Sequence, residues 1–337
     1  MRLQEADQKW DSIRRIPYSA PGRWIQTLDM ESLHCLSPED AFRVDEVLNR
    51  LFPLVPSLTR LILNPRTTFS RRVFSAFTYR DGIHNIRVLN GFQVPSSPQA
   101  DGDSFVELLR ACTRLEELEI VGTGIDISDM PSELELPNEP PPDFYPLRLP
   151  FLRKLAALSM PSSPILFALL HSPLPALRHL TLTPYDEFSV PTTLIPRFLT
   201  AHGGDVTSLH LYTVKQWPTT RFPTPPTLLE TCPRLRHASL ELPLPRLALP
   251  RAAHHAHLEI LSVPRPCADF WPALERLLPQ LPRLRFVRAR DVRWLRGGMS
   301  DRAQQAGVQG EMLLWRRRLT RRGVQLLDAE WKTGPEQ

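Results

Sequence analysis

The chain has 337 residues, 36 of them proline, and a formal net charge of +5. It contains no run of about 18 apolar residues and no apolar signal core at its start, so we expect no membrane span and a place inside the cell, in cytoplasm or nucleus. The four cysteines are far apart and show no CxxC pair. That usage fits reduced thiols and argues against a disulfide framework or a cysteine zinc site.

A leucine spacing of the type LxxLxL recurs along the whole chain. In PALRHLTL it is formed by Leu177, Leu180 and Leu182. Alternate side chains of a strand share a face, so the second and third of these residues point inward. The spacing returns about every 29 residues, at the top of the range for leucine-rich repeats.

The repeats predict the fold class. Parallel strands, each returning through a helix or irregular segment, bury one continuous core when they stack. We therefore expect an α/β leucine-rich repeat solenoid, a curved horseshoe with a parallel inner sheet and with helices and irregular segments outside. The predicted inward residues are Leu28, Leu61, Ile86, Leu118, Leu180, Leu209, Leu240, Leu261 and Val287.

Helix and strand patterns alternate in the first half of the chain. Residues 1–23 form a polar segment, and one repeat domain is expected from 24 to 337. The strand at 24–30 is followed by an amphipathic helix at 38–52, for which Ser37 is the expected cap. The same alternation then predicts strands at 58–63, 83–89 and 115–120 and helices at 67–79 and 103–111.

One insertion interrupts the repeats, from about 122 to 150. It is acidic and rich in proline, which favours an extended loop over a repeat. Two interpretations stay open, a solvated excursion and a flap that either contacts a partner or covers the protein's own surface. The repeat after it can be aligned as Leu155/Leu158/Met160 or as Leu152/Leu155/Ala157.

Shorter repeats follow, with proline before several strands. Helices are predicted at 162–171, 191–202, 225–231 and 268–279, then a strand at 284–289, a last helix through Leu319 and a closing strand at 324–328.

Both ends of the chain resemble those of a known family. The end reads LWRRRLTRRGVQLLDAEW and the start reads KWDSIRRIPYSAPGRWIQTLDM. Together with the irregular repeats, these segments resemble fungal, in particular basidiomycete, F-box/leucine-rich-repeat proteins. That resemblance implies an F-box ahead of the repeats, docked on a ubiquitin-ligase adaptor. No LPxE-type F-box is readable in residues 1–24, so we expect either that the gene lacks one or that it lies upstream.

The sequence gives little support for catalysis. It contains no GxSxG, P-loop, GxGxxG or HExxH motif, so we expect no enzyme, no cofactor and no metal site. The densest cluster of metal-ligating residue types is His254, His255 and His257. It has no acidic or thiol companion nearby, and we interpret it as an exposed loop.

The expected binding surface is the concave, outward side of the strands. Outward positions include Asn85, Arg87, Ala157 and Ser159. Among the outward positions we expect the partner site at Glu117, Glu119, His179, His210, Tyr212, His237 and Arg288. The predicted function is that of a protein-interaction module, a monomer with an unidentified protein partner.

The alternative is a nucleic-acid-binding repeat protein. It would use arginines near the end of the chain, namely Arg283, Arg285, Arg288, Arg290, Arg293, Arg296, Arg316, Arg317, Arg318, Arg321 and Arg322. Ordinary amphipathic surface explains these residues, and the aromatic residues that would stack on single-stranded bases are missing between them. A basic chain rich in arginine, proline and alanine is also typical of a GC-rich coding sequence.

Overall fold

The computed structural model describes residues 5, 21–34, 37–65, 69–94, 104–122, 139–160, 163–183, 194–212, 227–242, 244, 247–294 and 307–334. Most of the polar segment 1–23, the stretch 123–138 of the expected insertion, Cys35 and Arg296 lie outside these residues. The chain divides into a first unit, Met1–Leu177, and a second unit, Arg178–Gln337. The single repeat domain from 24 to 337 stays a prediction.

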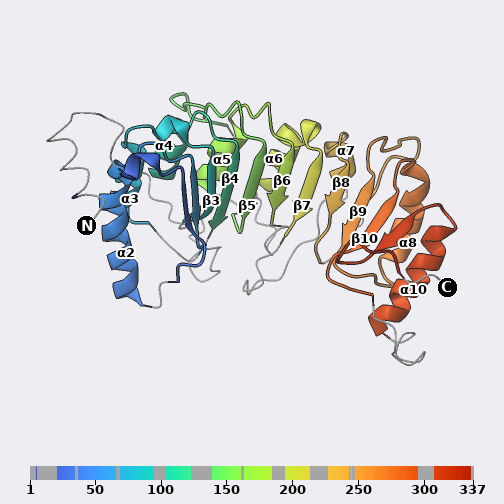
Figure 1. Cartoon of the computed structure of the whole chain (residues 1–337). Helices are drawn as coiled ribbons and strands as arrows, with labels where there is room; N and C mark the ends of the chain where they lie inside the picture. Colours follow the sequence, from blue (N-terminus) through green and yellow to red (C-terminus); the bar gives the residue numbers. More distant parts are fainter. Residues whose placement is uncertain are drawn as a thin grey trace. The chain divides into compact units, whose positions relative to one another are not determined.

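The fold is α/β, as the repeats predict. Among the described residues, eleven strands run parallel and follow one another in chain order (Figure 1). The first unit contains β1 (Thr27–Met30), β2 (Arg60–Leu63), β3 (Val88–Val94), β4 (Glu117–Gly122) and β5 (Lys154–Leu158). The second contains β6 (His179–Leu182), β7 (Ser208–Leu211), β8 (His237–Ser239), β9 (Ile260–Val263), β10 (Phe286–Ala289) and β11 (Gln325–Leu327).

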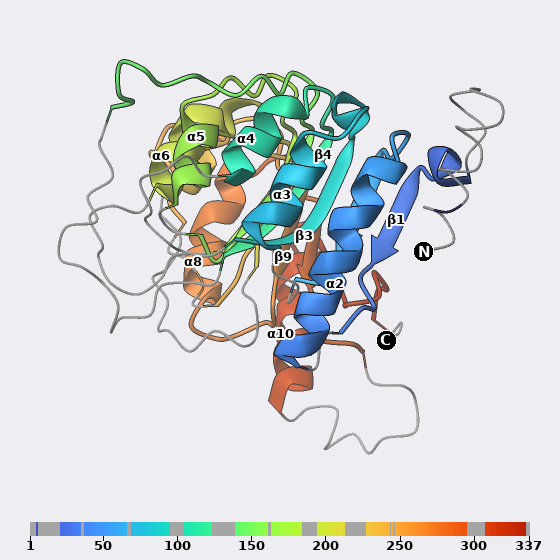
Figure 2. The same cartoon turned by 90° about the vertical axis from the view of Figure 1, so that its left-hand side faces the viewer.

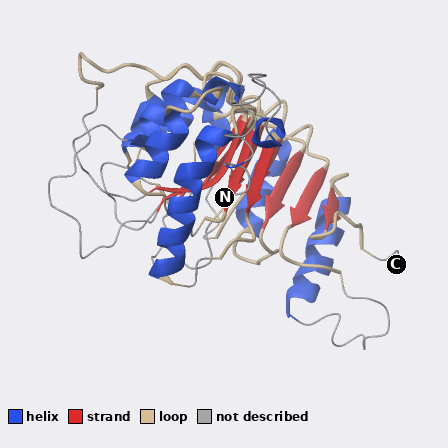
Figure 3. Cartoon of the chain, turned by 60° about the vertical axis from the view of Figure 1, so that its left-hand side comes forward, coloured by secondary structure: helices blue, strands red, loops and turns tan. Residues whose placement is uncertain are grey.

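Helices lie between the strands in sequence and cover one side of them in space. The first unit has α2 (Pro38–Leu51), α3 (Arg71–Thr78), α4 (Ser104–Ala111) and α5 (Pro164–Leu170). The second has α6 (Ile195–His202), α7 (Leu228–Thr231), α8 (Trp271–Leu277) and α10 (Gly307–Thr320). Figure 2 shows α2, α3 and α4 side by side in the first unit, and Figure 3 shows the helices as a layer outside the strands.

Serine caps explain where several helices begin. Ser37 Oγ accepts a hydrogen bond from the Asp40 amide at 3.1 Å, which confirms the predicted cap of α2. Ser70 caps α3 and Ser163 caps α5 in the same way. Each cap satisfies an amide that the first helical turn leaves without a partner.

The core follows the strand register. In the first unit the aligned inward residues are Leu28, Leu61, Leu89, Leu118 and Leu155. In the second they are Leu180, Leu209, Ala238, Leu261, Val287 and Leu326. All are buried except Leu28, which is half-buried on the first strand. Burial therefore confirms the predicted inward residues apart from Leu28.

The register of β3 corrects one part of the prediction. Ile86 is buried, but Leu89 pairs with Leu61, so Leu89 holds the position assigned to Ile86. Asn85 lies in a 3₁₀ helix, Ile83–Asn85, and is not an outward strand residue. The register shifts between Leu89 and Phe92, around Gly91 with φ of +74°. A Cβ at Gly91 would lie 2.1 Å from the Leu63 carbonyl oxygen, so this bulge requires glycine.

The register of β5 settles the alignment after the insertion. Leu155 pairs with Leu118, which selects Leu152/Leu155/Ala157. Ala157 and Ser159 are each 2% exposed, so the expectation that they face outward is wrong.

Candidate functional site

The outward side chains of the second unit form two rows across its strands. The first row is His179, Ser208, His237, Ile260, Phe286 and Gln325. The second row is Thr181, His210, Ser239, Ser262, Arg288 and Leu327. Tyr212, Glu241 and Arg290 continue the alternation just past the ends of their strands. We call these side chains the outward face.

The Arg290 side chain links residues of several strands at the carboxyl ends of the second row. Its Nη2 lies 2.8 Å from Glu241 Oε2, and the two side chains are only 15% and 12% exposed. Its Nη1 lies 3.2 Å from His210 Nε2 and 3.0 Å from Ser239 Oγ. Nη1 also lies 3.4 and 3.3 Å from carbonyl oxygens at the ends of β7 and β8. The guanidinium thus reaches from β10 to β7, and Arg290 holds the carboxyl ends of these strands together on the outward face.

The geometry assigns the state of His210. A guanidinium has only donors, so His210 Nε2 accepts from Arg290 and the ring carries its proton on Nδ1. Burial first, then Arg290 and Arg288, lower the pKa of His210 below its usual value. Protonation at Nε2 would abolish this bond and place two cations in contact.

Trp331 lies over the strands from the other side. The Arg288 guanidinium carbon is 4.2 Å from the centroid of the Trp331 ring, and the His237 ring meets it edge-on at 6.2 Å. Arg288 is on β10 and His237 on β8, so the indole lies over β9 between them. Beneath it Ser262 is fully buried, and its Oγ is 2.8 Å from His237 Nε2. We call Trp331, Arg288 and His237 the tryptophan platform.

A tight turn at the end of the chain holds Trp331 there. Asp328 is 3% exposed, and its Oδ1 accepts the amides of Glu330 and Lys332 at 2.8 and 2.9 Å. Its Oδ2 accepts the Trp294 amide at 3.2 Å. Trp331 itself has φ of +62°, a left-handed conformation that costs a non-glycine residue roughly 1–2 kcal/mol. The turn holds a strained residue with a large side chain that is still 47% exposed.

Burial also keeps His237 neutral. It lowers the pKa of His237 to about 4, with further contributions from His210 and Arg288. At neutral pH the tryptophan platform therefore carries one cation, Arg288, and two aromatic rings. Arg288 Nη2 donates to the Ala329 carbonyl at 2.7 Å, which fixes the guanidinium under the indole.

The predicted site residues are distributed over both units. In the second unit, Tyr212 is 37% exposed with its ring 5.8 Å from that of His210. His179 is exposed at the start of β6, and Ser208 separates it from His237 in the first row. The outward face therefore includes His179, His210, Tyr212, His237 and Arg288.

Glu117 and Glu119 belong to the first unit. Glu117 Oε1 lies 2.8 Å from Lys154 Nζ, so its charge is compensated. Burial, together with the nearby Glu31 carboxylate, raises the pKa of Glu119. Whether these two residues contribute to binding stays a prediction.

Sequence reasoning missed Trp331, Glu241 and the role of Arg290 in this site. The alternation of β7, β8 and β10 continues to Tyr212, Glu241 and Arg290, so extending the period of two beyond each strand could have found the last two. Trp331 gives no such signal. Its position depends on a turn that reverses the chain after β11, which strand periodicity does not encode.

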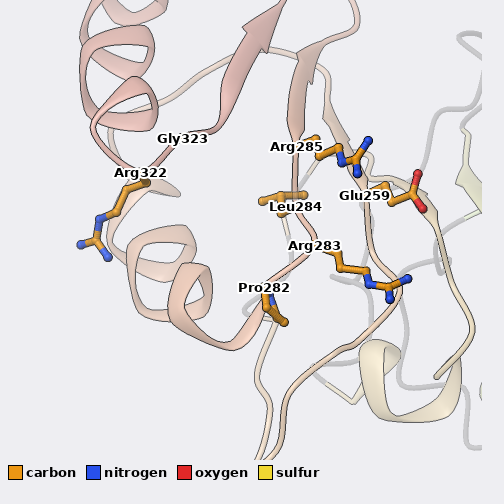
Figure 4. A pocket seen from close by; sticks show the side chains of 7 residues that line it. All are labelled: Glu259, Pro282, Arg283, Leu284, Arg285, Arg322 and Gly323. Carbon is orange, nitrogen blue, oxygen red and sulfur yellow. The ribbon is translucent and has the colours of Figure 1, made fainter.

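The arginines of the nucleic-acid alternative do not form one free cluster. Arg290 is paired with Glu241, Arg293 lies 3.2 Å from Glu330, and the Arg318 guanidinium lies 5.0 Å above the Trp271 ring. A hollow of about 570 Å³ is lined by Glu259, Pro282, Arg283, Leu284, Arg285, Arg322 and Gly323. Figure 4 shows Arg283 and Arg285 on the side of Glu259, whereas Arg322 points away from them.

The histidine cluster has a structural role at one position. His255 is 3% exposed, and its Nε2 lies 2.9 Å from the Cys232 carbonyl oxygen. Its Nδ1 accepts the Leu258 amide at 3.1 Å, so the expectation of an exposed loop is wrong for His255. Within the part of the chain that the structure describes, no group of three ligating side chains could hold a metal ion.

Comparison with protein-family models finds no match, and a search of curated proteins finds none either. No helix in the described ranges is long and apolar enough to span a membrane.

Proposed function

We propose that this chain is a protein-interaction module whose partner docks on the outward face of the second unit. The observation that carries the proposal is Trp331. Nearly half of its surface is open to solvent, although Arg288, His237 and the Asp328 turn hold it in one place. A large aromatic side chain fixed before binding loses little conformational entropy when it is covered.

The residue types on this face support the same proposal. Tryptophan, tyrosine and arginine most often dominate the energy of protein interfaces, and Trp331, Tyr212 and Arg288 all lie here. Ile260 and Phe286, half-buried in the first row, add apolar area beside the tryptophan platform. The outward face thus has a fixed, partly exposed tryptophan, Trp331, with polar side chains around it.

The resemblance of the chain to F-box/leucine-rich-repeat proteins suggests a finer proposal. In that form the docked protein would be a substrate presented to a ubiquitin ligase. Co-purification of the ligase adaptor with the chain, or with a longer product of the gene, would support it. Recovery of no adaptor would leave an interaction module that acts by itself.

Site-directed photocrosslinking tests the main proposal. Benzoylphenylalanine is placed at Tyr212 or Phe286 on the outward face, and at Tyr79 as a control that is 79% exposed in the first unit. We expect a crosslinked protein from positions 212 and 286, absent from position 79 and lost when Trp331→Ala is added. A crosslink that forms with equal yield at position 79, or whose yield at positions 212 and 286 is unchanged by Trp331→Ala, would contradict the proposal.

Nucleic-acid binding is the weaker alternative. Several of the arginines that it requires are engaged by carboxylates or aromatic rings of the same unit. We expect weak binding of single-stranded RNA that falls steeply with salt, as counterion release requires. Tight binding at physiological salt that is lost in Arg283→Glu/Arg285→Glu would reverse the ranking.

A further inference from the structure

The first row of the outward face is apolar next to the tryptophan platform, on the two strands that follow His237. Ile260 and Phe286 are adjacent in the register of β9 and β10. Trp331 lies over the same strands, with its ring against Arg288 of β10 and His237 of β8. We call Ile260, Phe286 and Trp331 the apolar strip.

Two arginines with a glutamate between them lie at the amino-terminal edge of the strands, next to the first row in sequence. Arg236 directly precedes β8 and Arg285 directly precedes β10. The Glu259 amide donates to the Arg236 carbonyl, and the Arg285 amide donates to the Glu259 carbonyl, both at 2.9 Å. Arg236, Glu259 and Arg285 are therefore consecutive along this edge, one residue before the first row.

The edge carries an excess of positive charge. Arg236, Arg283 and Arg285 are exposed, and no described carboxylate lies within ion-pair distance of their guanidinium groups. Figure 4 shows Arg283 and Arg285 directed to the same side of the hollow as Glu259. The half-buried Glu259 offsets one of the three charges and leaves two.

Two carboxylates on the rest of the outward face are already paired with cations and do not neutralise the positive charge of this edge. Glu241 is compensated by Arg290, and Glu330 lies 2.6 Å from Lys332 Nζ and 3.2 Å from Arg293 Nε. The apolar strip thus lies next to arginines whose positive charge is not fully neutralised by nearby carboxylates. Guanidinium groups bind carboxylates through charge-assisted hydrogen bonds, which are the stronger ones in proteins.

We infer that the partner presents an acidic peptide segment to this surface, with an aromatic or aliphatic residue on the apolar strip and carboxylates on Arg236, Arg283 and Arg285. The inference rests on the proposed function and specifies its ligand. Arg236 and Arg285 are two strands apart, about 10 Å between backbones. In a polyproline II conformation three residues span about 9 Å and make one full turn, so residues i and i+3 share a face. The matching peptide therefore has Asp or Glu at positions i and i+3, with the apolar residue between them.

Selection from a library of random 12-residue displayed peptides on the full chain tests this. We expect enrichment of peptides with two acidic residues three positions apart around an apolar residue. A synthetic peptide of the winning sequence should bind Arg283→Glu/Arg285→Glu at least about 10-fold more weakly, and Arg236→Glu more weakly as well. Arg251→Glu is the matched control, since Arg251 is exposed in the same unit, and should bind as the wild type does.

The other outcomes separate this inference from the proposed function. Neutral or basic winning peptides whose binding is lost in Trp331→Ala would overturn the acidic ligand and keep the outward face as the site. Winning peptides that bind Trp331→Ala normally, or no enrichment at all, would overturn both. A fluorescein-labelled single-stranded RNA that binds more tightly than the best peptide and displaces it would identify nucleic acid as the ligand.

Discussion

The pair of Arg290 and Glu241 shows how a charged side chain on the outward face can stabilise the fold. Both side chains are largely covered, and Arg290 has five further hydrogen-bond partners, one of them the exposed Asp291 carboxylate at 3.3 Å from Nε. Removing one partner of a buried pair typically costs about 3–5 kcal/mol, and Asp291 offsets part of the charge that Arg290 keeps. We expect Glu241→Gln to lower the free energy of unfolding by about 3 kcal/mol in urea titrations.

A matched control separates burial from charge. Arg234 and Asp205 form an ion pair whose side chains are 66% and 46% exposed. Solvent screens such a pair, so Asp205→Asn should cost less than about 1 kcal/mol. Equal losses in Glu241→Gln and Asp205→Asn would show that the Arg290 pair is not buried in solution.

His237 makes stability depend on pH. Its pKa falls from 6.5 in the unfolded chain to about 4 in the folded chain. Between pH 6.5 and pH 4, His237 therefore binds a proton in the unfolded chain but not in the folded chain. The free energy of unfolding falls over this interval as the pH is lowered. The loss is on the order of 2–3 kcal/mol for this residue.

His237→Gln isolates this effect, because the amide keeps a hydrogen-bonding group near Ser262 but does not titrate. We compare urea midpoints of wild type and variant at pH 7 and pH 5. The wild type should lose more stability than the variant over this interval. Parallel curves would mean that His237 is protonated in the folded chain.

At the scale of elements, the turn after β11 positions Trp331. Its left-handed backbone is strained in any residue with a Cβ. Trp331→Ala removes the stacking and keeps the strain, whereas Trp331→Gly removes both. We expect Trp331→Gly to be more stable than Trp331→Ala by about 1 kcal/mol in chemical denaturation. The reverse order, as glycine would give at an ordinary turn position, would refute the left-handed conformation.

The segments before two strands bury a cysteine each. Cys112 and Cys232 are both 0% exposed, and burial raises the pKa of each thiol to about 12. Thiolate is the reactive form, so neither should react with Ellman's reagent at pH 8 while the chain is folded. Mass-spectrometric mapping before and after addition of urea checks this. Prompt modification of either thiol in the folded chain would contradict its burial.

At the scale of the whole molecule, the alternation of inward and outward residues is the main prediction from sequence. Leu180 is 1% exposed and the adjacent His179 is exposed. Leu180→Asp buries an unpaired charge and should lower the free energy of unfolding by several kcal/mol. His179→Asp is the matched control and should change it by less than about 1 kcal/mol. An unchanged thermal midpoint in Leu180→Asp would contradict the stacking of these strands.

Most of the fold could be predicted because most strands carry their own LxxLxL spacing. The prediction failed where two phases of an apolar run compete. In β3, Ile86, Val88 and Leu89 fit either phase, and the bulge at Gly91 decides between them. At β5 both alignments place leucines inward, and only pairing with β4 selects one.

The residues of the outward face could be predicted in part. His210, Tyr212, His237 and Arg288 followed from alternation along single strands. Trp331 did not, because an aspartate-centred turn brings it back over β9. Arg290 was considered only for the nucleic-acid alternative, because its ion pair with Glu241, from β10 to β8, is not visible in a local sequence pattern.

Fluorine NMR of the chain labelled with 5-fluorotryptophan tests the central claim most directly. The chain has seven tryptophans, and Trp331→Phe identifies the resonance of Trp331. On addition of a selected acidic peptide, the Trp331 signal should shift in proportion to occupancy, while that of the fully buried Trp315 stays in place. A peptide that binds without moving the Trp331 signal, or that moves instead the signal of Trp24 in the first unit, would contradict the outward face as the binding site.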